Sequence, residues 1–498
     1  MTTPERLRNA SVKQALKGNA EEPRLGKFGC YVGGEWIETA DAVEVRSPFD
    51  ESLIAIVHRA GPQEIETAIA KASTAFQVTR KIPTWKRTEI LEKISAGIAA
   101  RREELAQTIA LEAGKPIRTA RTEVDRAVFT FKIAGEESKR IYGELVPLDW
   151  IPGTEGREAQ IHRIPLGPIV GISPFNFPLN LVAHKVAPAL AAGNPIILRP
   201  ASQTPISALK LAQIISASGW PVEAFSVVPS ATKDAAPLVE DDRIRLLTFT
   251  GSPAVGWSLK TRAGRKRVTL ELGGNAGVIV HSDADVAYAA ERVAWGGFSY
   301  AGQSCISVQR VYVHANVYES FVKQFVQRVK AFKVGDPLDE ATDIGPLIDN
   351  GAAERVEAWV AEAQEDGARL LTGGSRTGNL WQPTVLAEIK PAMRVSCQEV
   401  FAPLVGLYPY TDIGQAIAAV DDSDFGLQAG LFTRDLGIVR QAFDDIEVGG
   451  LMVNDVSTFR IDHMPYGGVK QSGFGREGLR YAIEEMSELK LLTFNYRI

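Results

Sequence analysis

One cysteine of the chain, Cys305, lies in a short polar segment, residues 302–307, with the sequence GQSCIS. In a chain with few cysteines a lone thiol is either inert core or a catalyst. Taken alone, the structural interpretation is the better one, because free cysteine is among the most buried residue types. A chemical role therefore needs support from other reactive side chains.

Three further segments supply such side chains. Residues 270–275 (LELGGN) place the carboxylate of Glu271 between leucines at a predicted strand end, beside glycines that let another group approach. Residues 174–178 (PFNFP) hold the side-chain amide of Asn176 in a proline-bounded turn, and residues 398–403 (QEVFAP) add a second carboxylate and an aromatic ring. Together these segments favour chemistry at Cys305 over a purely structural thiol.

Several other patterns do not qualify as sites. Residues 473–478 match G-x-G-x-x-G, but no convincing strand precedes them and only 20 residues follow, so they are predicted to form a turn before a helix. Residues 251–256 have P-loop spacing, with Trp257-Ser258 where Lys-Ser/Thr is needed. The six histidines show no ligand spacing, so no metal site is predicted.

An α/β framework must position these groups. Between residues 167 and 274, short apolar runs alternate with helical patterns, which predicts a parallel, doubly wound sheet that binds ligands at the carboxyl ends of its strands. Thr204 is predicted to be the N-cap of one of these helices, with Pro205 as its first residue. Residues 275–462 hold a second α/β set, which predicts two such sheets.

Composition narrows the class of protein. The 55 basic and 60 acidic residues give a net charge of −5, which argues against a nucleic-acid-coating protein and a polybasic membrane binder. No apolar stretch reaches about 18 residues, and the first 27 residues have no apolar signal region. The three cysteines fit a reducing compartment. We therefore expect a cytoplasmic enzyme with no membrane or nucleic-acid partner.

In their order and separations, the four reactive segments resemble those of the aldehyde dehydrogenase superfamily. Residues 464–468 (MPYGG), with SG at 472–473 and GRE at 475–477, resemble the C-terminal signature of that family. The resemblance implies two doubly wound parallel-sheet domains and a small β arm for oligomerisation. The expected ranges are an N-terminal arm at 1–27, a cofactor-binding domain at 28–142 and 165–273, a catalytic domain at 274–478, and oligomerisation or bridging elements at 143–164 and 479–498.

The resemblance also implies a role for each reactive side chain. Cys305 would attack an aldehyde carbon as a thiolate, and the amide of Asn176 and the backbone N–H of Cys305 would bind the resulting oxyanion. Hydride would then pass to a nicotinamide, and Glu271 would activate the water that hydrolyses the remaining thioester.

The implied cofactor is NAD or NADP. Residues 250–252 end a strand and open a helix, whose N-terminus can face a pyrophosphate. Strict NAD members carry a glutamate where this chain has Ser202, and Arg199 replaces the usual lysine; both departures favour NADP. The cofactor contacts expected from the family are Phe175, Arg199, Ala201, Ser202, Gly251, Ser252, Leu272, Glu399 and Phe401.

The implied substrate is a small hydroxyaldehyde or semialdehyde. Residues 200–205 resemble succinate-semialdehyde members, although His184 stands where their carboxylate-binding arginine is expected. Residues 459–466 resemble lactaldehyde and glyceraldehyde-type members, in which Arg460 would either meet a polar or anionic tail or form a loop salt bridge.

Other functions remain open at this point. They are an acylating, coenzyme A-dependent semialdehyde dehydrogenase, a non-catalytic protein on the same scaffold, and a thiol hydrolase. Glu271 weighs against the first, because the acylating branch generally lacks that glutamate. The polar tip at residues 153–156 indicates a protruding hairpin, which in the family joins a neighbour's sheet, so a homodimer or homotetramer is expected.

Overall fold

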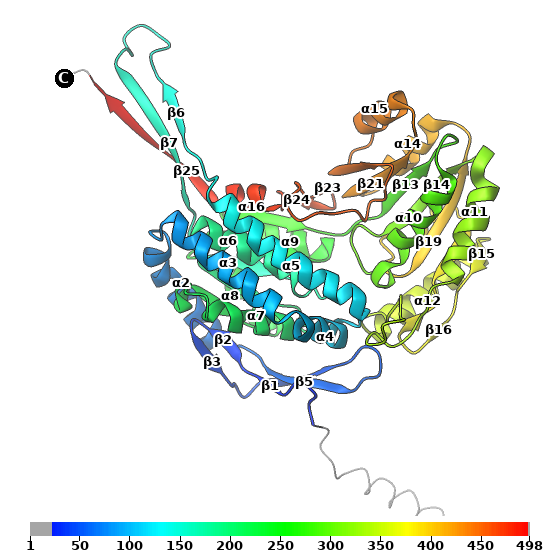
Figure 1. The fold of residues 1–498 in the computed structure, drawn as a ribbon, viewed down its shortest axis with the longest axis horizontal. Coiled ribbons are helices and arrows are strands. Elements are labelled where there is room, and N and C mark those ends of the chain that lie inside the picture. Colours follow the sequence, from blue (N-terminus) through cyan, green and yellow to red (C-terminus); the bar gives the residue numbers. More distant parts are fainter. Residues whose placement is uncertain (1–21, 497–498) are drawn as a thin grey trace, which may run out of the picture.

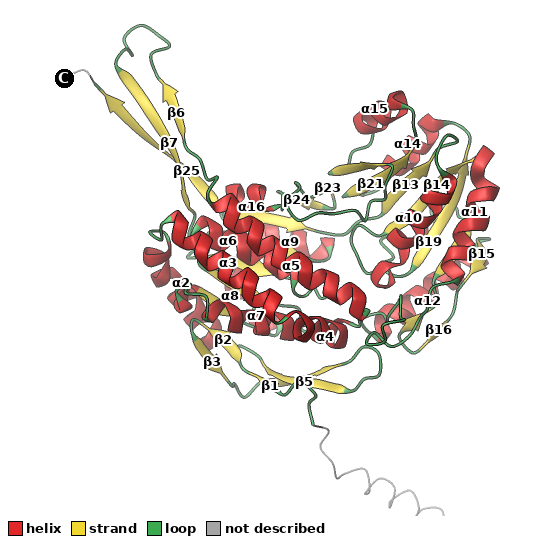
Figure 2. Ribbon diagram, viewed as in Figure 1, coloured by secondary structure: helices red, strands yellow, loops and turns green. Residues whose placement is uncertain are grey.

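Two large sheets flanked by helices form the framework of the computed structural model, which describes residues 22–496. Figure 1 shows the two units side by side, with a long β arm projecting from the first, and Figure 2 shows helices covering both sheets. The predicted α/β class with two parallel-sheet units is confirmed. Residues 1–21 of the predicted N-terminal arm lie outside the described range.

The first sheet has eight strands, and its five central strands, from β12 to β10 in sheet order, are parallel. Short apolar strands buried on both faces are typical of such sheets. In sheet order the strands are β24 (Gly473–Phe474), β12 (Arg267–Glu271), β11 (Leu246–Thr250), β8 (Ile169–Ile172), β9 (Ile196–Arg199), β10 (Phe225–Val227), β2 (Cys30–Val32) and β3 (Glu35–Ile37). The chain returns to this sheet at β24, within the range expected for the catalytic domain.

Helices pack on both faces of this sheet. They are α2 (Pro62–Thr79), α3 (Thr84–Ala100), α4 (Arg102–Ala113), α5 (Ile117–Ser138), α6 (Asn180–Ala192), α7 (Ile206–Ser216), α8 (Ala236–Glu240), α9 (Pro253–Arg262) and α16 (Leu479–Glu485). Helix α3 buries Ile90, Leu91, Ile94 and Ile98 at the spacing of one helical face. Each such side chain contributes about 1.5–3 kcal/mol when fully buried.

Helix α7 corrects one prediction. It begins at Ile206, with Pro205 at the N-cap, so Thr204 is not the capping residue. The carboxylate of Glu112 in α4 accepts the backbone N–H groups of Ile206 and Ser207, at 2.8 and 2.9 Å. A neighbouring helix thus satisfies the first N–H groups that the sequence pattern assigned to a local cap.

The second sheet has seven strands, of which only the edge strand β15 runs antiparallel to its neighbour. In sheet order they are β15 (Arg369–Thr372), β18 (Thr384–Ala387), β19 (Leu404–Tyr410), β14 (Val308–His314), β13 (Ala276–Val280), β21 (Gln428–Phe432) and β22 (Gly450–Val453). Its helices are α10 (Val286–Phe298), α11 (Ala315–Lys330), α12 (Asn350–Glu365), α13 (Arg394–Cys397), α14 (Ile413–Asp421) and α15 (Leu436–Asp445).

The arm is a three-stranded antiparallel sheet in which β7 (Arg157–Pro165) pairs with β6 (Glu144–Pro147) and with β25 (Ser487–Asn495). Its strand β25 exposes several apolar side chains, Leu489, Leu491 and Leu492.

Three smaller sheets complete the fold: β1 (Lys27–Phe28) with β5 (Leu53–His58) and β4 (Ala42–Arg46), β16 (Arg376–Thr377) with β17 (Leu380–Trp381), and β20 (Phe425–Gly426) with β23 (Val469–Lys470). None of the helices within residues 22–496 combines the length and apolarity needed to cross a membrane.

Candidate active site

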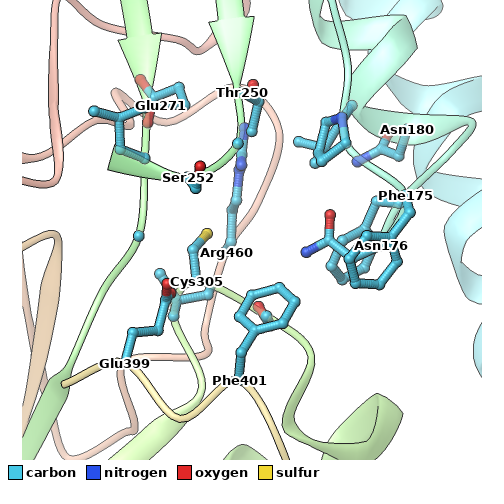
Figure 3. Close-up of a pocket in the computed structure, with 18 of the residues that line it drawn as sticks. Phe175, Asn176, Asn180, Thr250, Ser252, Glu271, Cys305, Glu399, Phe401 and Arg460 are labelled. Carbon is cyan, nitrogen blue, oxygen red and sulfur yellow. The ribbon is translucent and has the colours of Figure 1, made fainter. Parts of the chain in front are cut away.

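The predicted reactive residues meet at one cavity of about 370 Å³. Residues from the ends of β11 and β12, from the turn after β8 and from the loop before β14 all line it. Figure 3 shows the sulfur of Cys305 pointing into this cavity, with Asn176 and Phe175 opposite and Glu399 and Phe401 beside it. The carboxyl ends of the parallel strands of the first sheet therefore form one wall, as the doubly wound topology predicts.

A strained backbone turn presents Cys305. Tyr300 and Ala301, within the 3-10 turn Ser299–Gly302, have left-handed φ angles of 50° and 53°, and Gly302 follows at 66°. Non-glycine residues in this region cost about 1–3 kcal/mol each and persist where the surroundings hold them. The Tyr300 hydroxyl donates to the carbonyl of Ala113 at 2.8 Å, and a side chain at Gly302 would collide with the Ala402 carbonyl. The turn is thus held on both sides.

The thiol of Cys305 is half-buried and lies 3.1 Å from the hydroxyl oxygen of Tyr466. Burial raises the pKa of Cys305 to about 12, while the hydrogen bond from Tyr466 acts to lower it. Gly274 leaves room for this segment, because a Cβ there would lie 2.1 Å from the carbonyl oxygen of Cys305. Neither Cys30, buried with Sγ 3.5 Å from the Ile37 carbonyl, nor the exposed Cys397 lines the cavity.

The side-chain amide of Asn176 is oriented by the chain itself. Its Nδ2 donates to the backbone carbonyl of Gln303 at 3.0 Å, while its Oδ1 is buried without a hydrogen-bond partner. Because a carbonyl cannot accept from Oδ1, this contact fixes the NH₂ group on the side of the Cys305 segment. The turn is anchored by Glu123 of α5, which accepts the backbone N–H groups of Leu179 and Asn180.

Glu271 ends β12 and is 2% exposed. Neither of its carboxylate oxygens has a hydrogen-bond partner. Burial, and then the nearby Glu477, raise the pKa of Glu271 well above its usual value. Burial acts on Glu477 in the same direction, but Lys185 and Arg460 outweigh it and hold the pKa of Glu477 at about 2. Glu271 is thus a basic, unpaired carboxylate facing the cavity.

The residues expected to contact the pyrophosphate and the nicotinamide of the cofactor line the same cavity. Ser252 caps helix α9 without using its hydroxyl on the helix end, which leaves that hydroxyl and the first N–H groups for an anion. Side chains at Gly251 and Gly273 would collide with the Phe249 ring and the Glu399 carboxylate. Glu399 accepts the N–H of Gly274 at 2.8 Å, and burial raises its pKa to about 7.

Two aromatic rings border this part of the cavity. Phe175 and Phe401 lie edge to face with ring centroids 5.9 Å apart, and Phe401 has a left-handed φ of 50°. Leu272, at the other side, is 1% exposed and lines the cavity as well.

Arg199 is the last residue of β9, Ala201 and Ser202 follow it, and none of the three lines this cavity. The Arg199 guanidinium donates to Ser230, through Nε to Oγ at 3.1 Å and Nη2 to the carbonyl at 3.0 Å, and contacts Thr232 at 3.4 Å. Ser202 is exposed. They occupy the carboxyl edge of the same sheet, beyond the cavity.

A second cavity of about 470 Å³ adjoins the first. Arg126, Phe177, Ser304, Ile306 and Arg460 line both cavities. A molecule that enters through the second cavity therefore passes these five residues before it reaches Cys305.

Asp462, in the loop after β22, is hydrogen-bonded to two helices of the first unit. It accepts from Arg126 of α5 at 2.6 Å and from His184 of α6 at 2.8 Å. His184, which stands at the position expected for a carboxylate-binding arginine, is thus 2% exposed, bonded to Asp462, and outside the cavity lining. Arg460 forms the salt bridge considered for it, from its Nη2 to Glu477 at 3.0 Å. It also lines both cavities, with its Nε unpaired, and contact with a substrate tail stays a prediction. No cluster of three or more metal-ligating side chains occurs in the described part of the chain.

A family model described as "Aldehyde dehydrogenase family" matches residues 36–492. The chain belongs to the aldehyde dehydrogenase family. It is 46% identical over 476 residues to the 3-sulfolactaldehyde dehydrogenase of Priestia aryabhattai, a match that covers 95% of this chain and 99% of the relative.

Two solved structures have the same fold as this aldehyde dehydrogenase. Aldehyde dehydrogenase 21 from Physcomitrella patens, in complex with the reaction product succinate, is 42% identical with a TM-score of 0.93, covering 95% of this chain and 99% of that one. Glyceraldehyde-3-phosphate dehydrogenase from Methanocaldococcus jannaschii, complexed with NADP, is 38% identical with a TM-score of 0.89, covering 92% and 100%. The protein is an aldehyde oxidoreductase that uses NAD or NADP, as predicted.

Tyr466, Arg126 and Arg355 are among the residues of this aldehyde dehydrogenase site that were not predicted. Tyr466 lies within the MPYGG segment, so the sequence marked its neighbourhood without indicating contact with Cys305. Arg126 and Arg355 line the cavity from helices α5 and α12, where a single arginine on an amphipathic helix gives no such signal. Only the packing of distant elements reveals them.

Proposed function

We propose that this aldehyde dehydrogenase oxidises a small aldehyde with a hydroxylated or anionic tail to its carboxylic acid, through a thioester on Cys305 that water hydrolyses. One observation supports hydrolysis of the thioester over its transfer to coenzyme A: Glu271 lies in the same cavity as Cys305, buried and with both oxygens unpaired. A carboxylate held in this way is a strong base, able to take a proton from a water beside the thioester.

Each of the other side chains in the cavity has a separate role in this reaction. Cys305 adds to the aldehyde carbon as a thiolate, and the second hydrogen of the Asn176 amide binds the oxyanion together with the backbone N–H of Cys305; each such donor is typically worth about 10²–10³ in rate. When bound, the oxidised nicotinamide supplies the hydride acceptor. Glu399, Phe401 and the backbone of Leu272 would hold its ribose, ring and amide, while Gly251 and Ser252 would meet the pyrophosphate. The unit around the first sheet would thus bind the cofactor, and the unit around the second would carry the nucleophile.

Two arginines that line both cavities, Arg126 and Arg460, indicate the chemistry of the substrate tail. Arg460 is buried with an unpaired Nε, and Arg126 lines both cavities. Guanidinium donors bind carboxylate, sulfonate and phosphate groups well. The compounds named for the three relatives carry a sulfonate, a carboxylate and a phosphate, which supports an anionic tail here.

A panel of aldehydes tests this function by absorbance of the reduced cofactor at 340 nm, with and without coenzyme A. We expect turnover without coenzyme A, with higher kcat/KM for short aldehydes bearing an anionic or hydroxyl tail than for aromatic ones. Turnover that requires coenzyme A would favour the acylating branch, and no turnover with any aldehyde would favour a non-catalytic protein.

We propose that the enzyme prefers NADP to NAD. Arg199, held by Ser230 and Thr232, ends β9, and the exposed Ser202 follows three residues later, so a 2′-phosphate at this edge of the sheet would meet a fixed guanidinium and a hydroxyl donor. Ser202→Glu should lower kcat/KM for NADP by about 10-fold or more, since a carboxylate repels phosphate by more than about 1.4 kcal/mol at this range. Ser202→Ala is the matched control and should change it far less. A wild-type preference for NAD, unchanged by Ser202→Glu, would contradict the proposal.

The arm is proposed to join copies of the chain into a homodimer or homotetramer. Leu489, Leu491 and Leu492 are exposed on β25, and an exposed apolar strand at a sheet edge is normally covered. Light scattering of the full chain measures the assembly directly, and a monomer at micromolar concentration would contradict it.

A further inference from the structure

Within residues 22–496, the thiol of Cys305 has one hydrogen-bond partner, the hydroxyl of Tyr466. The two atoms are 3.1 Å apart, although 161 positions separate the residues in sequence. An O···S distance of this length is a direct hydrogen bond and leaves no room for an intervening water. The contact therefore acts on the reacting atom itself.

The surroundings of Tyr466 fix its hydroxyl in this place. Its backbone exchanges two hydrogen bonds with Glu477, at 3.1 and 2.6 Å, and its ring packs against Ile306 and Leu427. The residue is 3% exposed. A phenol held at both ends in this way does not have to be ordered when the substrate binds.

The charges around the pair decide which atom donates. The guanidinium of Arg460 lies over the Tyr466 ring at 3.6 Å, which polarises the hydroxyl and makes it a better donor. Burial keeps the pKa of Tyr466 well above its usual value, so the phenol stays protonated. Glu271 and Glu399 face the thiol from β12 and from the loop before β19, and both oppose a thiolate. Against these two carboxylates, Arg460 and the phenol are the groups that favour the charged sulfur.

We propose that Tyr466 is a catalytic residue whose hydroxyl donates a hydrogen bond to the Cys305 thiolate. The inference rests on the proposed role of Cys305 as nucleophile. The bond strengthens when the sulfur is charged, in the free enzyme and again when the thiolate leaves the hydrolysed acyl group. It weakens when the sulfur is bonded to carbon. Tyr466 thus raises the fraction of thiolate at neutral pH and stabilises the leaving group of the second half-reaction.

The test measures the thiolate rather than turnover. Full-length wild type and Tyr466→Phe are alkylated with iodoacetamide between pH 6 and 10.5, and the labelled fraction of the Cys305 peptide is followed by mass spectrometry. Because burial places the pKa of Cys305 above this range, the alkylation rate should rise with pH throughout it, and at each pH it should be about 10-fold or more lower in Tyr466→Phe, the size of one hydrogen bond to a charged group. The steepness of the rise with pH should be the same in both proteins, because the thiolate is the reacting species in each.

The controls separate the possible outcomes. Tyr408→Phe removes another buried hydroxyl, one that donates to Ser396 at 2.7 Å, and should leave the Cys305 profile unchanged. An unshifted profile in Tyr466→Phe would overturn the role of Tyr466 and leave Cys305 as nucleophile. Loss of NADP binding in that variant would also overturn it, in favour of a structural role. Full activity in Cys305→Ala would instead overturn the proposed function on which the inference rests.

Discussion

Alanine in place of Cys305 is expected to remove aldehyde oxidation, by at least about 10⁴-fold in kcat, while NADP binding stays within a few-fold of wild type. The thiol lines the same cavity as Asn176 and Glu271, and no other cysteine does so. Stopped-flow measurement of reduced cofactor gives the first quantity, and quenching of tryptophan fluorescence by NADP gives the second.

Two serine variants are matched controls. Cys30→Ser keeps a donor to the Ile37 carbonyl, and Cys397→Ser changes an exposed side chain, so both should retain activity. Loss of cofactor affinity comparable to the loss of rate in Cys305→Ala would make Cys305 a structural residue. Inactivation by either serine variant without unfolding would contradict a single nucleophile.

Glutamine in place of Glu271 should stall the second half-reaction. Acylation does not need the base, so rapid mixing should show a burst of about one reduced cofactor per active site, followed by turnover slowed about 10²–10⁴-fold. Because burial raises the pKa of Glu271, deacylation in wild type should rise with pH as the carboxylate loses its proton. That pH dependence should vanish in Glu271→Gln.

Another buried carboxylate provides the control for this prediction. Glu112 is 1% exposed and caps α7, away from the cavity, so Glu112→Gln should lower the melting temperature without creating a burst. A Glu271→Gln variant that lacks a burst and slows the first step equally would place the main role of Glu271 before hydride transfer.

The sequence predicted those parts of the site that depend on topology. Glu271 ends one parallel strand, Gly251 and Asn176 follow the ends of two others, and such ends meet at one edge of a sheet. The glycines after Glu271 likewise indicated that another group approaches closely there, and the backbone of Cys305 lies against Gly274. These features follow from backbone geometry and short-range pattern.

Contacts made by distant side chains could not be predicted in the same way. The cap of α7 comes from Glu112, 94 positions before Ile206, where the local pattern favoured Thr204. The anchor of Arg199 comes from Ser230, and the partner of Cys305 from Tyr466. Each of these three contacts depends on how distant helices and loops pack together, and the pattern of apolar residues along the sequence does not show that packing.

Peptide mass spectrometry of Glu271→Gln, mixed with NADP and a small anionic aldehyde and quenched in acid within one turnover, would detect the thioester itself. The expected result is an acyl adduct on the Cys305 peptide at close to one per chain, absent from Cys30 and Cys397 and not accumulated in wild type. An adduct on another residue, or reduced cofactor formed with no adduct at Cys305, would contradict hydrolysis through a Cys305 thioester.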